Sequence, residues 1–562
     1  MITLYRADNS TVDYQCALEL EDYCGLKAAE LISFRVERLV IHELLVRVTS
    51  DLSVPDGPNY EDLGINLRSM VSTIYQRHIE PEIDNFQNQY ERKLSESSQY
   101  MRQQLDEQLF AGNKREPETK NNSLLKKWFG AKSAPAKVAT LSDPKEFQAL
   151  AYWQNELDKT SQSVQTHSLA ALIKTVNALL TNRGRAGNDA DMILAIATNC
   201  VSNPIGSEVV SQLITPLFDA AVEAEGYRKL PLQKKPVVMN VKGASASGKS
   251  TIRPQQQQLA DKLGIPWEDF ALISPDYWRK YLLDYSTLGD DYKYEAMLTG
   301  QELELVDKKL DRYMAQKAEK GEIPHLLIDR FRFDSFSVED GRSHDNKLLS
   351  RFGDRIFMFF MITPPEETVV RAWERGLITG RFKAVDDLLY HNIEAYTGIP
   401  ALFFSWVLFT NKKVHFEFLD NDVPKGQLPK TIAFGQDQCM TILNIDSMCN
   451  IDRFKKVNIE ATNAAQVLTG NDESAHTTFL SKCISRIRQV QFADTKTSEV
   501  YARFENGKLQ WIDERIFNRQ TLTPEQKKLF HDRKSSGAES GIDQYTIPAE
   551  EKKLTLGQWS AG

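Results

Sequence analysis

The chain has 562 residues, of which 41% are hydrophobic and 26% are charged, and its formal net charge is -8. This length exceeds that of an ordinary single core, so we expect two to four domains. The acidic balance argues against a dedicated nucleic-acid-binding protein, which is usually basic, but it leaves room for a local basic cleft.

The six cysteines are sparse and match no zinc-binding spacing. They are too few for a disulfide scaffold, so a reducing compartment is expected. The first residues lack the pattern of a signal peptide, and the longest apolar runs are far too short to span a bilayer. We therefore predict a cytoplasmic protein without a transmembrane segment. Delivery into a host cell by dedicated machinery would leave no trace in these patterns.

The first part of the chain has helical periodicity. Residues 1–110 predict an α-helical N-terminal domain, interrupted at 55–59 by prolines and a glycine. Residues 111–145 are polar and basic with three prolines, as in a flexible linker. Helical apolar stripes return in 146–230, which predicts helices that pack on the following domain. The helical N-terminal region is also a candidate binding region for a protein partner.

Short apolar runs alternate with helical stretches from 235 to 422. These β-type runs occupy 237–241, 270–273, 326–328, 356–362 and 414–419. Near-continuous apolar strands separated by helices are typical of a parallel sheet that is covered on both faces. We therefore predict an α/β domain with a five-stranded, mostly parallel sheet.

The remaining residues predict a smaller α+β region at 423–535. Two β-type runs flank Asn506 and Gly507, a pair that favours a tight hairpin turn. A capping pattern that begins at Thr523 predicts a further helix. Residues 536–562 have the polar composition of a disordered tail.

The stretch GASASGKST at 243–251 directly follows the first apolar run and precedes a helical pattern. It fits G-x-x-x-x-G-K-[ST], a phosphate-binding loop in which backbone N–H groups and a helix N-terminus surround phosphate. Lys249 is expected to reach the β- and γ-phosphates, and Ser250 to place its hydroxyl on Mg²⁺. The candidate nucleotide-binding residues are Gly243, Ala244, Ser245, Ala246, Ser247, Gly248, Lys249, Ser250 and Thr251. Pro254 predicts a kink in the helix that follows.

The second strand ends in Ser274-Pro275-Asp276-Tyr277-Trp278-Arg279. Ligands of open α/β sheets bind at this carboxyl edge. Asp276 could accept the proton of a substrate hydroxyl that attacks the γ-phosphate, and Arg279 could hold an anionic substrate. Alternatively, Asp276 caps the next helix, a role that is compatible with the first.

Three arginines lie within eleven residues after the fourth strand: Arg371, Arg375 and Arg381. The first two are four residues apart and share a helix face. Arginines on a mobile flap suit a lid that closes on ATP and neutralises charge as the phosphoryl group moves. A solvated basic helix is the alternative, but a position downstream of a phosphate loop favours the lid.

Taken in order, GASASGKST, ISPDYWRKY, a helix-strand segment ending in HLLID, and TPPEETVVRAWERGLITGR resemble the zeta-toxin family of phosphate-loop kinases. More loosely, they are similar to chloramphenicol phosphotransferase and polynucleotide-kinase relatives. The resemblance covers about 235–422. It implies a toxin or effector kinase that uses ATP or GTP with Mg²⁺ to phosphorylate a hydroxyl, often of UDP-N-acetylglucosamine or, in related effectors, of NAD.

The resemblance also implies roles for single residues. Lys249 and Ser250 would bind phosphates and Mg²⁺, Asp276 would be the base, and the three arginines would act in the lid. Asp329, which ends the third strand, is a second candidate for holding Mg²⁺, through water. Residues 330–334 are bulky and charged where family members often have a small Gly/Thr-containing turn, so the acceptor nucleotide is left open.

Two other functions are compatible with the same motifs. The first is a nucleotide-dependent ATPase or switch with partner-binding helical domains, and the second is a scaffold whose loop binds nucleotide without chemistry. A GTPase is disfavoured because Asn411-Lys412-Lys413 lacks the base-reading aspartate. A polynucleotide kinase is disfavoured because no basic stripe accompanies the acidic balance.

Overall fold

The structure is a computed structural model of the whole chain. It describes residues 2–59, 61–110, 144–329, 352–379, 382–408, 411–468, 477–539 and 545–559. The chain divides into two compact units, one of Met1–Leu45 with Val71–Gly226 and one of Val46–Met70 with Tyr227–Gly562. No helix in these described ranges is long and apolar enough to cross a membrane.

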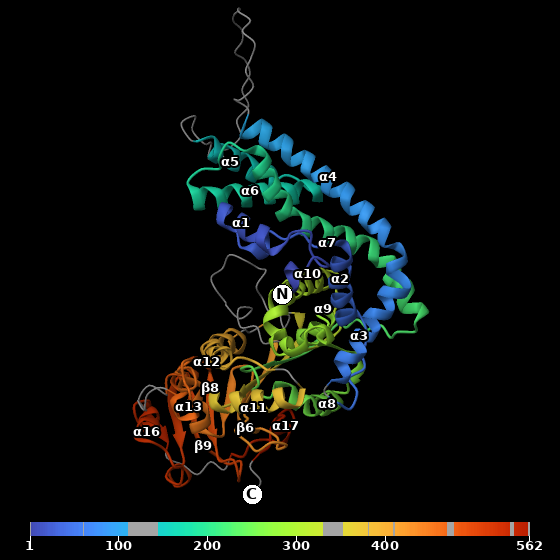
Figure 1. Ribbon diagram of the computed structural model, residues 1–562. Coiled ribbons are helices and arrows are strands. Elements are labelled where there is room, and N and C mark those ends of the chain that lie inside the picture. The colour runs from blue at the N-terminus through green and yellow to red at the C-terminus, as the bar shows by residue number, and fades with distance from the viewer. Residues whose placement is uncertain are drawn as a thin grey trace, which may run out of the picture. The chain divides into compact units, whose positions relative to one another are not determined.

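The described chain before Tyr227 is mainly helical, in the first unit and in residues 46–51 and 62–70 of the second, and the helices predicted from periodicity are confirmed. They are α1 (Tyr14–Cys24), α2 (Val36–Asp51), α3 (Asp62–Ile74), α4 (Ile83–Gln108), α5 (Lys145–Leu157), α6 (Ser163–Arg183) and α7 (Ala190–Ala224). The long helices α4 and α7 lie side by side, and α6 packs on both (Figure 1). The predicted linker lies almost wholly outside the described residues, and the predicted domain boundaries stay predictions.

The second unit is built on a sheet that is larger than predicted. Within the described residues, eleven strands form one sheet in the order β11-β10-β9-β8-β7-β6-β5-β4-β1-β3-β2. Their bounds are β1 Val237–Lys242, β2 Phe270–Ile273, β3 His325–Asp329, β4 Arg355–Ile362, β5 Lys413–Asp420, β6 Lys430–Gln436, β7 Cys439–Ile442, β8 Gln489–Ala493, β9 Val500–Glu505, β10 Lys508–Ile512 and β11 Lys534–Glu539.

The helices of this unit separate or follow the strands (Figure 1). They are α8 (Arg253–Lys262), α9 (Arg279–Leu282), α10 (Glu295–Glu319), α11 (Pro365–Thr379), α12 (Val385–Val407), α13 (Ile445–Arg453), α14 (Thr478–Arg486), α15 (Glu514–Phe517), α16 (Pro524–His531) and α17 (Ala549–Lys552). The unit therefore has a mixed α/β fold.

The five predicted strands are β1 to β5, and their pairings with one another are all parallel. The prediction of a sheet limited to five strands is wrong, because β6 pairs antiparallel with β5 and continues the same sheet. Strand β4 explains why the apolar pattern was continuous, since Phe360 packs on Phe403 of α12 while its neighbour Phe359 is buried as well. A strand buried on both faces carries no polar alternation.

The predicted hairpin and capping box are confirmed. Strands β9 and β10 pair antiparallel, and the turn residues Asn506 and Gly507 have φ of 49° and 79°, as a type I′ turn requires. The side chain of Thr523 accepts from the backbone N–H of Gln526, whose side chain accepts in return from the backbone N–H of Thr523.

The prediction of a disordered tail is wrong for residues 545–559. The backbone N–H of Leu556 donates to Glu417 Oε2 at 2.7 Å, and that of Gly557 donates to Glu417 Oε1 at 3.0 Å. Gln558 forms a parallel bridge with Lys430 at the start of β6. This C-terminal segment (545–559) thus packs on the sheet, because a buried carboxylate binds its backbone.

Candidate phosphate-binding site

The loop at 243–251 joins the fully buried strand β1 to helix α8. A 3₁₀ turn at Lys249–Ile252 follows the loop, and the α-helix begins only at Arg253. Pro254 is therefore the second residue of α8, where its missing N–H costs no helical hydrogen bond. The predicted kink inside the helix is replaced by this junction between two helix types.

Both motif glycines are required by close packing. A Cβ on Gly243 would lie 2.9 Å from the backbone oxygen of Met361, and one on Gly248 would lie 2.3 Å from Asn421 Nδ2. Gly248 also has φ of 89°, which disfavours other residues. Residues at the carboxyl ends of β4 and β5 therefore pack closely against both glycines of the loop.

Hydrogen bonds from these strand ends hold the loop in place. The backbone oxygen of Ser247 accepts from Asn421 Nδ2 at 2.8 Å and from Thr363 Oγ1 at 3.0 Å. Tyr396 fixes Thr363 in turn, since its hydroxyl donates to the Thr363 oxygen at 2.6 Å. No motif marks these three residues in the sequence, although Thr363 and Asn421 each follow an apolar strand directly, which is the available signal.

Lys249 lies at the centre of the loop. Its Nζ donates to the backbone oxygens of Gly243 at 3.1 Å and Ala244 at 2.8 Å. Burial lowers the pKa of Lys249, whereas the charges of Asp329 and Asp276 oppose this shift. The ammonium is thus folded onto the carbonyls of its own loop, within the field of both predicted acids.

Ser250 and Asp329 are brought together as the metal hypothesis requires. Ser250 Oγ donates to Asp329 Oδ2 at 2.7 Å, across the adjacent strands β1 and β3. A hydroxyl and a carboxylate are hard oxygen ligands that fit Mg²⁺, which usually keeps waters and substrate phosphates as its other ligands. The described residues contain no group of three or more His, Cys, Asp or Glu that could hold a metal ion, so Mg²⁺ here would depend on phosphate oxygens.

A buried ion pair between residues that no sequence motif marks supports the start of α8. Arg253 Nη1 lies 3.0 Å from Asp56 Oδ1, and Arg253 Nη2 lies 4.0 Å from Asp329 Oδ2. Tyr277 also accepts from Arg253, at 3.4 Å. The guanidinium therefore links the first turn of α8 to the predicted metal ligand.

Asp276 lies beyond the end of β2 with its side chain 54% exposed, paired with Arg279 Nε at 3.0 Å. The alternative that Asp276 caps a helix is wrong, because the N-cap of this 3₁₀ turn is Ser274. Arg279 Nη1 also donates to the backbone oxygen of Ala296 and to Thr299 Oγ1 on α10, at 3.1 and 2.8 Å. Arg279 is thereby anchored on α10, and its predicted contact with an anionic substrate stays a prediction.

The three predicted lid arginines differ in their surroundings. Arg371 Nη2 donates to the backbone oxygen of Asn421 at 2.7 Å, which ties α11 to the segment after β5. Arg375 lies close enough to Lys249 for its charge to lower the pKa of that lysine. Arg381 lies outside the described residues, so its lid role stays a prediction.

Lys383 and His391 contact each other, and no sequence motif marks either residue. Lys383 Nζ lies 2.5 Å from His391 Nδ1. Burial lowers the pKa of Lys383 to about 8, against the opposing charges of Asp387 and Asp276. Burial, followed by the charges of Lys383 and Lys249, lowers the pKa of His391 to about 3, so the imidazole is neutral at physiological pH.

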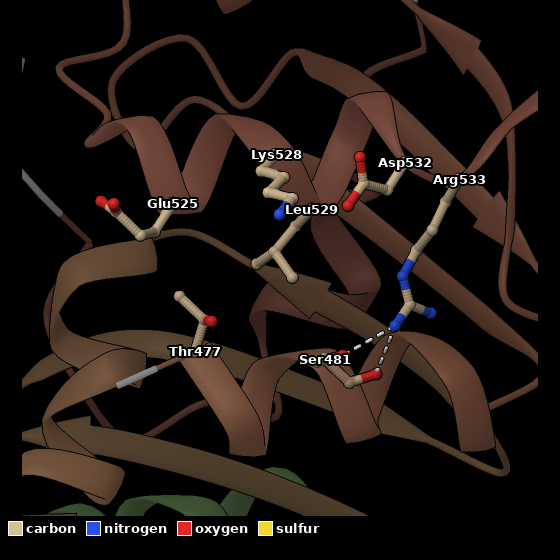
Figure 2. A pocket seen from close by; sticks show the side chains of 7 residues that line it. All are labelled: Thr477, Ser481, Glu525, Lys528, Leu529, Asp532 and Arg533. Carbon is tan, nitrogen blue, oxygen red and sulfur yellow. Dashed lines mark hydrogen bonds between the residues drawn. The ribbon is translucent and has the colours of Figure 1, made fainter. Parts of the chain in front are cut away.

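A separate cavity of about 540 Å³ lies between α14 and α16. Figure 2 shows its lining, in which Arg533 donates to Ser481. Two acidic and two basic side chains face it: Glu525, Asp532, Lys528 and Arg533. Because these charges balance and none belongs to the loop, the cavity is a poor match for polyphosphate.

Comparisons with known proteins add little to this geometry. No family model matches the chain, and no curated protein matches it. Among solved structures, the chain is similar to one from a molecular and structural characterization of the PezAT chromosomal toxin-antitoxin system of Streptococcus pneumoniae. The identity is 16%, over 38% of this chain and 77% of that chain, with a TM-score of 0.24. A likeness this low establishes neither a fold nor a function for this chain.

Proposed function

We propose that the protein is a kinase that transfers the γ-phosphoryl group of ATP to a hydroxyl of a small molecule. The observation that carries this proposal is the shared edge: the loop with Lys249, the Ser250–Asp329 pair and the Asp276 carboxylate all follow parallel neighbouring strands. Strands in a sheet lie about 4.8 Å apart, so the ends of β1 and β2, with β3 between them, are roughly 10 Å apart. That distance leaves room for a phosphoryl group and an acceptor.

The nucleotide would bind at the loop. Its phosphates accept from backbone N–H groups at the start of the helical turn, where the partial positive charge also lies. Lys249 would exchange its carbonyl partners, Gly243 and Ala244, for phosphate oxygens, because charge-assisted hydrogen bonds are stronger than those to neutral acceptors. Ser250 and Asp329 would hold Mg²⁺, which neutralises phosphate charge when it is bound.

Transfer then requires an acceptor next to Asp276. The acceptor hydroxyl gives its proton to the Asp276 carboxylate, its oxygen forms a bond to the γ-phosphorus, and the bond from that phosphorus to the β–γ bridging oxygen breaks, leaving ADP. Arg279 orients the carboxylate through the 3.0 Å contact of its Nε. By the zeta-toxin resemblance of the motifs, we propose a nucleotide or nucleotide-sugar as acceptor, with UDP-N-acetylglucosamine and NAD as candidates, and a toxin or effector role.

Hydrolysis of ATP is the second candidate function. The 54% exposure of the Asp276 side chain favours it, because a carboxylate that is open to solvent can also orient water. In that case the same edge would serve a nucleotide-dependent switch.

One experiment separates these functions. The protein is incubated with Mg²⁺ and γ-labelled ATP, with and without a metabolite extract, and labelled products are identified by mass spectrometry. A labelled metabolite supports the kinase, whereas labelled inorganic phosphate alone supports hydrolysis. The control is Lys249→Ala, which should keep the fold and lower either reaction by about 100-fold or more, as the loss of a preorganised cation does. Unchanged turnover in that variant would remove the loop from the reaction.

A further inference from the structure

Asp56 lies in the interruption between α2 and α3, which is rich in proline and contains a glycine. It belongs to the same compact unit as the phosphate-binding loop. Ser53 Oγ donates to the backbone oxygen of Glu268 at 2.8 Å, and Asn66 Nδ2 donates to that of Pro55 at 2.9 Å. These hydrogen bonds hold the chain that leads to Asp56 in place.

Both carboxylate oxygens of Asp56 contact side chains of α8. Oδ1 accepts from Arg253 Nη1 at 3.0 Å, and Oδ2 accepts from Gln257 Nε2 at 3.4 Å. The same Nη1 donates to the hydroxyl of Tyr277 at 3.4 Å, so both of its N–H groups have a partner. Asp56 and Tyr277 thus hold one side of the guanidinium.

The other side of the guanidinium approaches Asp329 without a direct hydrogen bond. Arg253 Nη2 lies 4.0 Å from Asp329 Oδ2, which is beyond hydrogen-bond range, whereas Ser250 Oγ donates to this oxygen at 2.7 Å. A bidentate pair with arginine would occupy both oxygens of the carboxylate. Arg253 therefore attracts Asp329 by its charge but does not occupy the oxygens that a metal ion would need.

Water screens these three charges poorly. The side chains of Asp56 and Arg253 are each 9% exposed, and that of Asp329 is 13% exposed. Two carboxylates and one guanidinium give this cluster one net negative charge, and charges interact strongly away from water. Without the charge of Asp56, Arg253 and Asp329 would balance each other, and the attraction for a cation would fall.

Resting on the nucleotide site of the proposed function, we propose that Asp56 is a positioning residue for Mg²⁺. By binding Arg253, it keeps the guanidinium off Asp329, so that Asp329 and Ser250 can bind the metal ion. Asp56 acts through these residues and need not touch the metal or the substrate. Loss of such an outer partner of a metal ligand commonly lowers metal affinity by about 10- to 100-fold.

The test measures how far Mg²⁺ strengthens nucleotide binding, with the β,γ-imido analogue of ATP as a probe that is not turned over. Calorimetry gives its Kd with excess Mg²⁺ and with EDTA. We expect Asp56→Asn to raise the Kd with Mg²⁺ by about 10-fold or more, while the Kd with EDTA changes little because the loop is untouched.

The matched control is Asp269→Asn. It removes the carboxylate of another Arg–Asp pair in the same unit, with Arg228, and the side chain of Asp269 is 14% exposed. This variant should bind the analogue as the wild type does under both conditions, because Asp269 has no contact with Arg253 or Asp329.

A double variant separates a positioning role from a merely structural one. Asp56→Asn with Arg253→Met removes both charges of the pair, which restores the net charge around Asp329 and leaves no guanidinium to bind it. Replacing a whole buried ion pair is often tolerated, whereas removing one partner is not, so the double variant should bind the analogue with Mg²⁺ within about threefold of the wild type. A structural role predicts binding no tighter than that of Asp56→Asn.

The outcomes distinguish this proposal from the kinase. Equal Kd values with Mg²⁺ in Asp56→Asn and the wild type overturn the role of Asp56, as does a wild type whose binding Mg²⁺ does not strengthen, and transfer of γ-label still decides the kinase. A wild type that labels no acceptor overturns the kinase, whereas the effect of Asp56 on binding stands. If Asp56→Asn does not fold, as judged by its thermal transition, the double variant decides, and weakened binding with Mg²⁺ there contradicts the proposal.

Discussion

Two regions of the second unit each contain a carboxylate, and the two carboxylates differ in exposure and in hydrogen bonding. At the carboxyl edge of β1 to β5, Asp276 is 54% exposed and sits among cations. Where the C-terminal segment crosses β5 and β6, Glu417 is fully buried and accepts hydrogen bonds from Thr431 Oγ1 and the backbone N–H groups of Leu556 and Gly557. The first arrangement leaves an acid open to a ligand, and the second uses an acid to fasten a segment of chain.

This difference shows why the residue type alone does not mark a functional site. Both carboxylates follow or lie in apolar strands of one sheet, yet only Asp276 has solvent and a cationic neighbourhood around it. A carboxylate whose lone pairs are occupied by backbone donors has little left for chemistry. The comparison predicts that changes at the carboxyl edge alter turnover, whereas changes at Glu417 and its partners alter stability.

The largest effect is expected for Asp276→Asn. Loss of the general base should lower phosphoryl transfer by at least about 100-fold, while ATP affinity stays close to that of the wild type because the loop is untouched. Turnover and ATP affinity would be measured on the same preparation. Asp261→Asn, an exposed change on α8, is the control. Full transfer by Asp276→Asn would remove this residue from the role of base and erase the contrast with Glu417.

The next largest effect is a dependence of the free energy of unfolding on pH, which arises from Glu417. Burial raises the pKa of Glu417 from 4.5 to about 7 and outweighs the backbone and hydroxyl donors. A raised folded-state pKa means that its contribution to stability is fully present below about pH 4.5 and is lost as the pH rises through about 7. The difference corresponds to roughly 3 kcal/mol.

Denaturant unfolding at several pH values tests this expectation. Glu417→Gln cannot ionise, so its stability should lack this decline even if its absolute value is lower than that of the wild type. An equal decline in both proteins would assign the pH dependence to other groups.

A smaller loss of stability is expected for Gly557→Ala. The added Cβ would lie 2.6 Å from the backbone nitrogen of Thr431 and 2.7 Å from Leu419 Cδ2, so the C-terminal segment must shift. Overpacking of this kind costs about 1–3 kcal/mol, measured as the free energy of unfolding. Gly300→Ala, which has open space around it on α10, should be neutral or stabilising. If Gly557→Ala also alters phosphoryl transfer per folded molecule, the C-terminal segment affects turnover as well as stability, and the comparison of the two regions fails.

The smallest effect is expected for Asn421→Ala. Ser247 would lose one donor to its backbone oxygen and keep the bond from Thr363 Oγ1, so the cost should be about 1 kcal/mol. Thr363→Val removes the other donor, and the double variant should lose more than the sum of the two single variants because no donor then remains. Strict additivity would show that the two contacts act independently, which contradicts their sharing one acceptor.

The sequence predicted the parallel strands and the loop because both depend on local patterns. Each strand is a short apolar run ended by polar residues, and the loop has a fixed spacing of glycines before Lys249. The continuation of the sheet could not be read in the same way, since β7 and β8 pair in parallel across a long stretch of intervening chain. Arg253 and Asp56 are 197 residues apart, and only the fold brings them together.

For a related reason, some residues of the candidate site could be predicted from the sequence and others could not. Ser250 and Asp329 could be named because they end or follow strands, and strand ends meet at one edge. Lys383 and His391 follow no motif, although Lys383 Nζ lies 2.5 Å from His391 Nδ1. The C-terminal segment was misjudged because polar composition suggests disorder, whereas Leu556 and Gly557 bind a carboxylate that lies far away in the sequence.

The hydrogen bonds between Glu417 and the C-terminal segment have a consequence for folding during synthesis. Leu556 follows Glu417 by 139 residues, which at ordinary translation rates is a delay on the order of ten seconds. During that interval the nascent sheet holds a carboxylate whose backbone donors do not yet exist. The ribosome must therefore release the chain through Gly557 before this part of the interior can close.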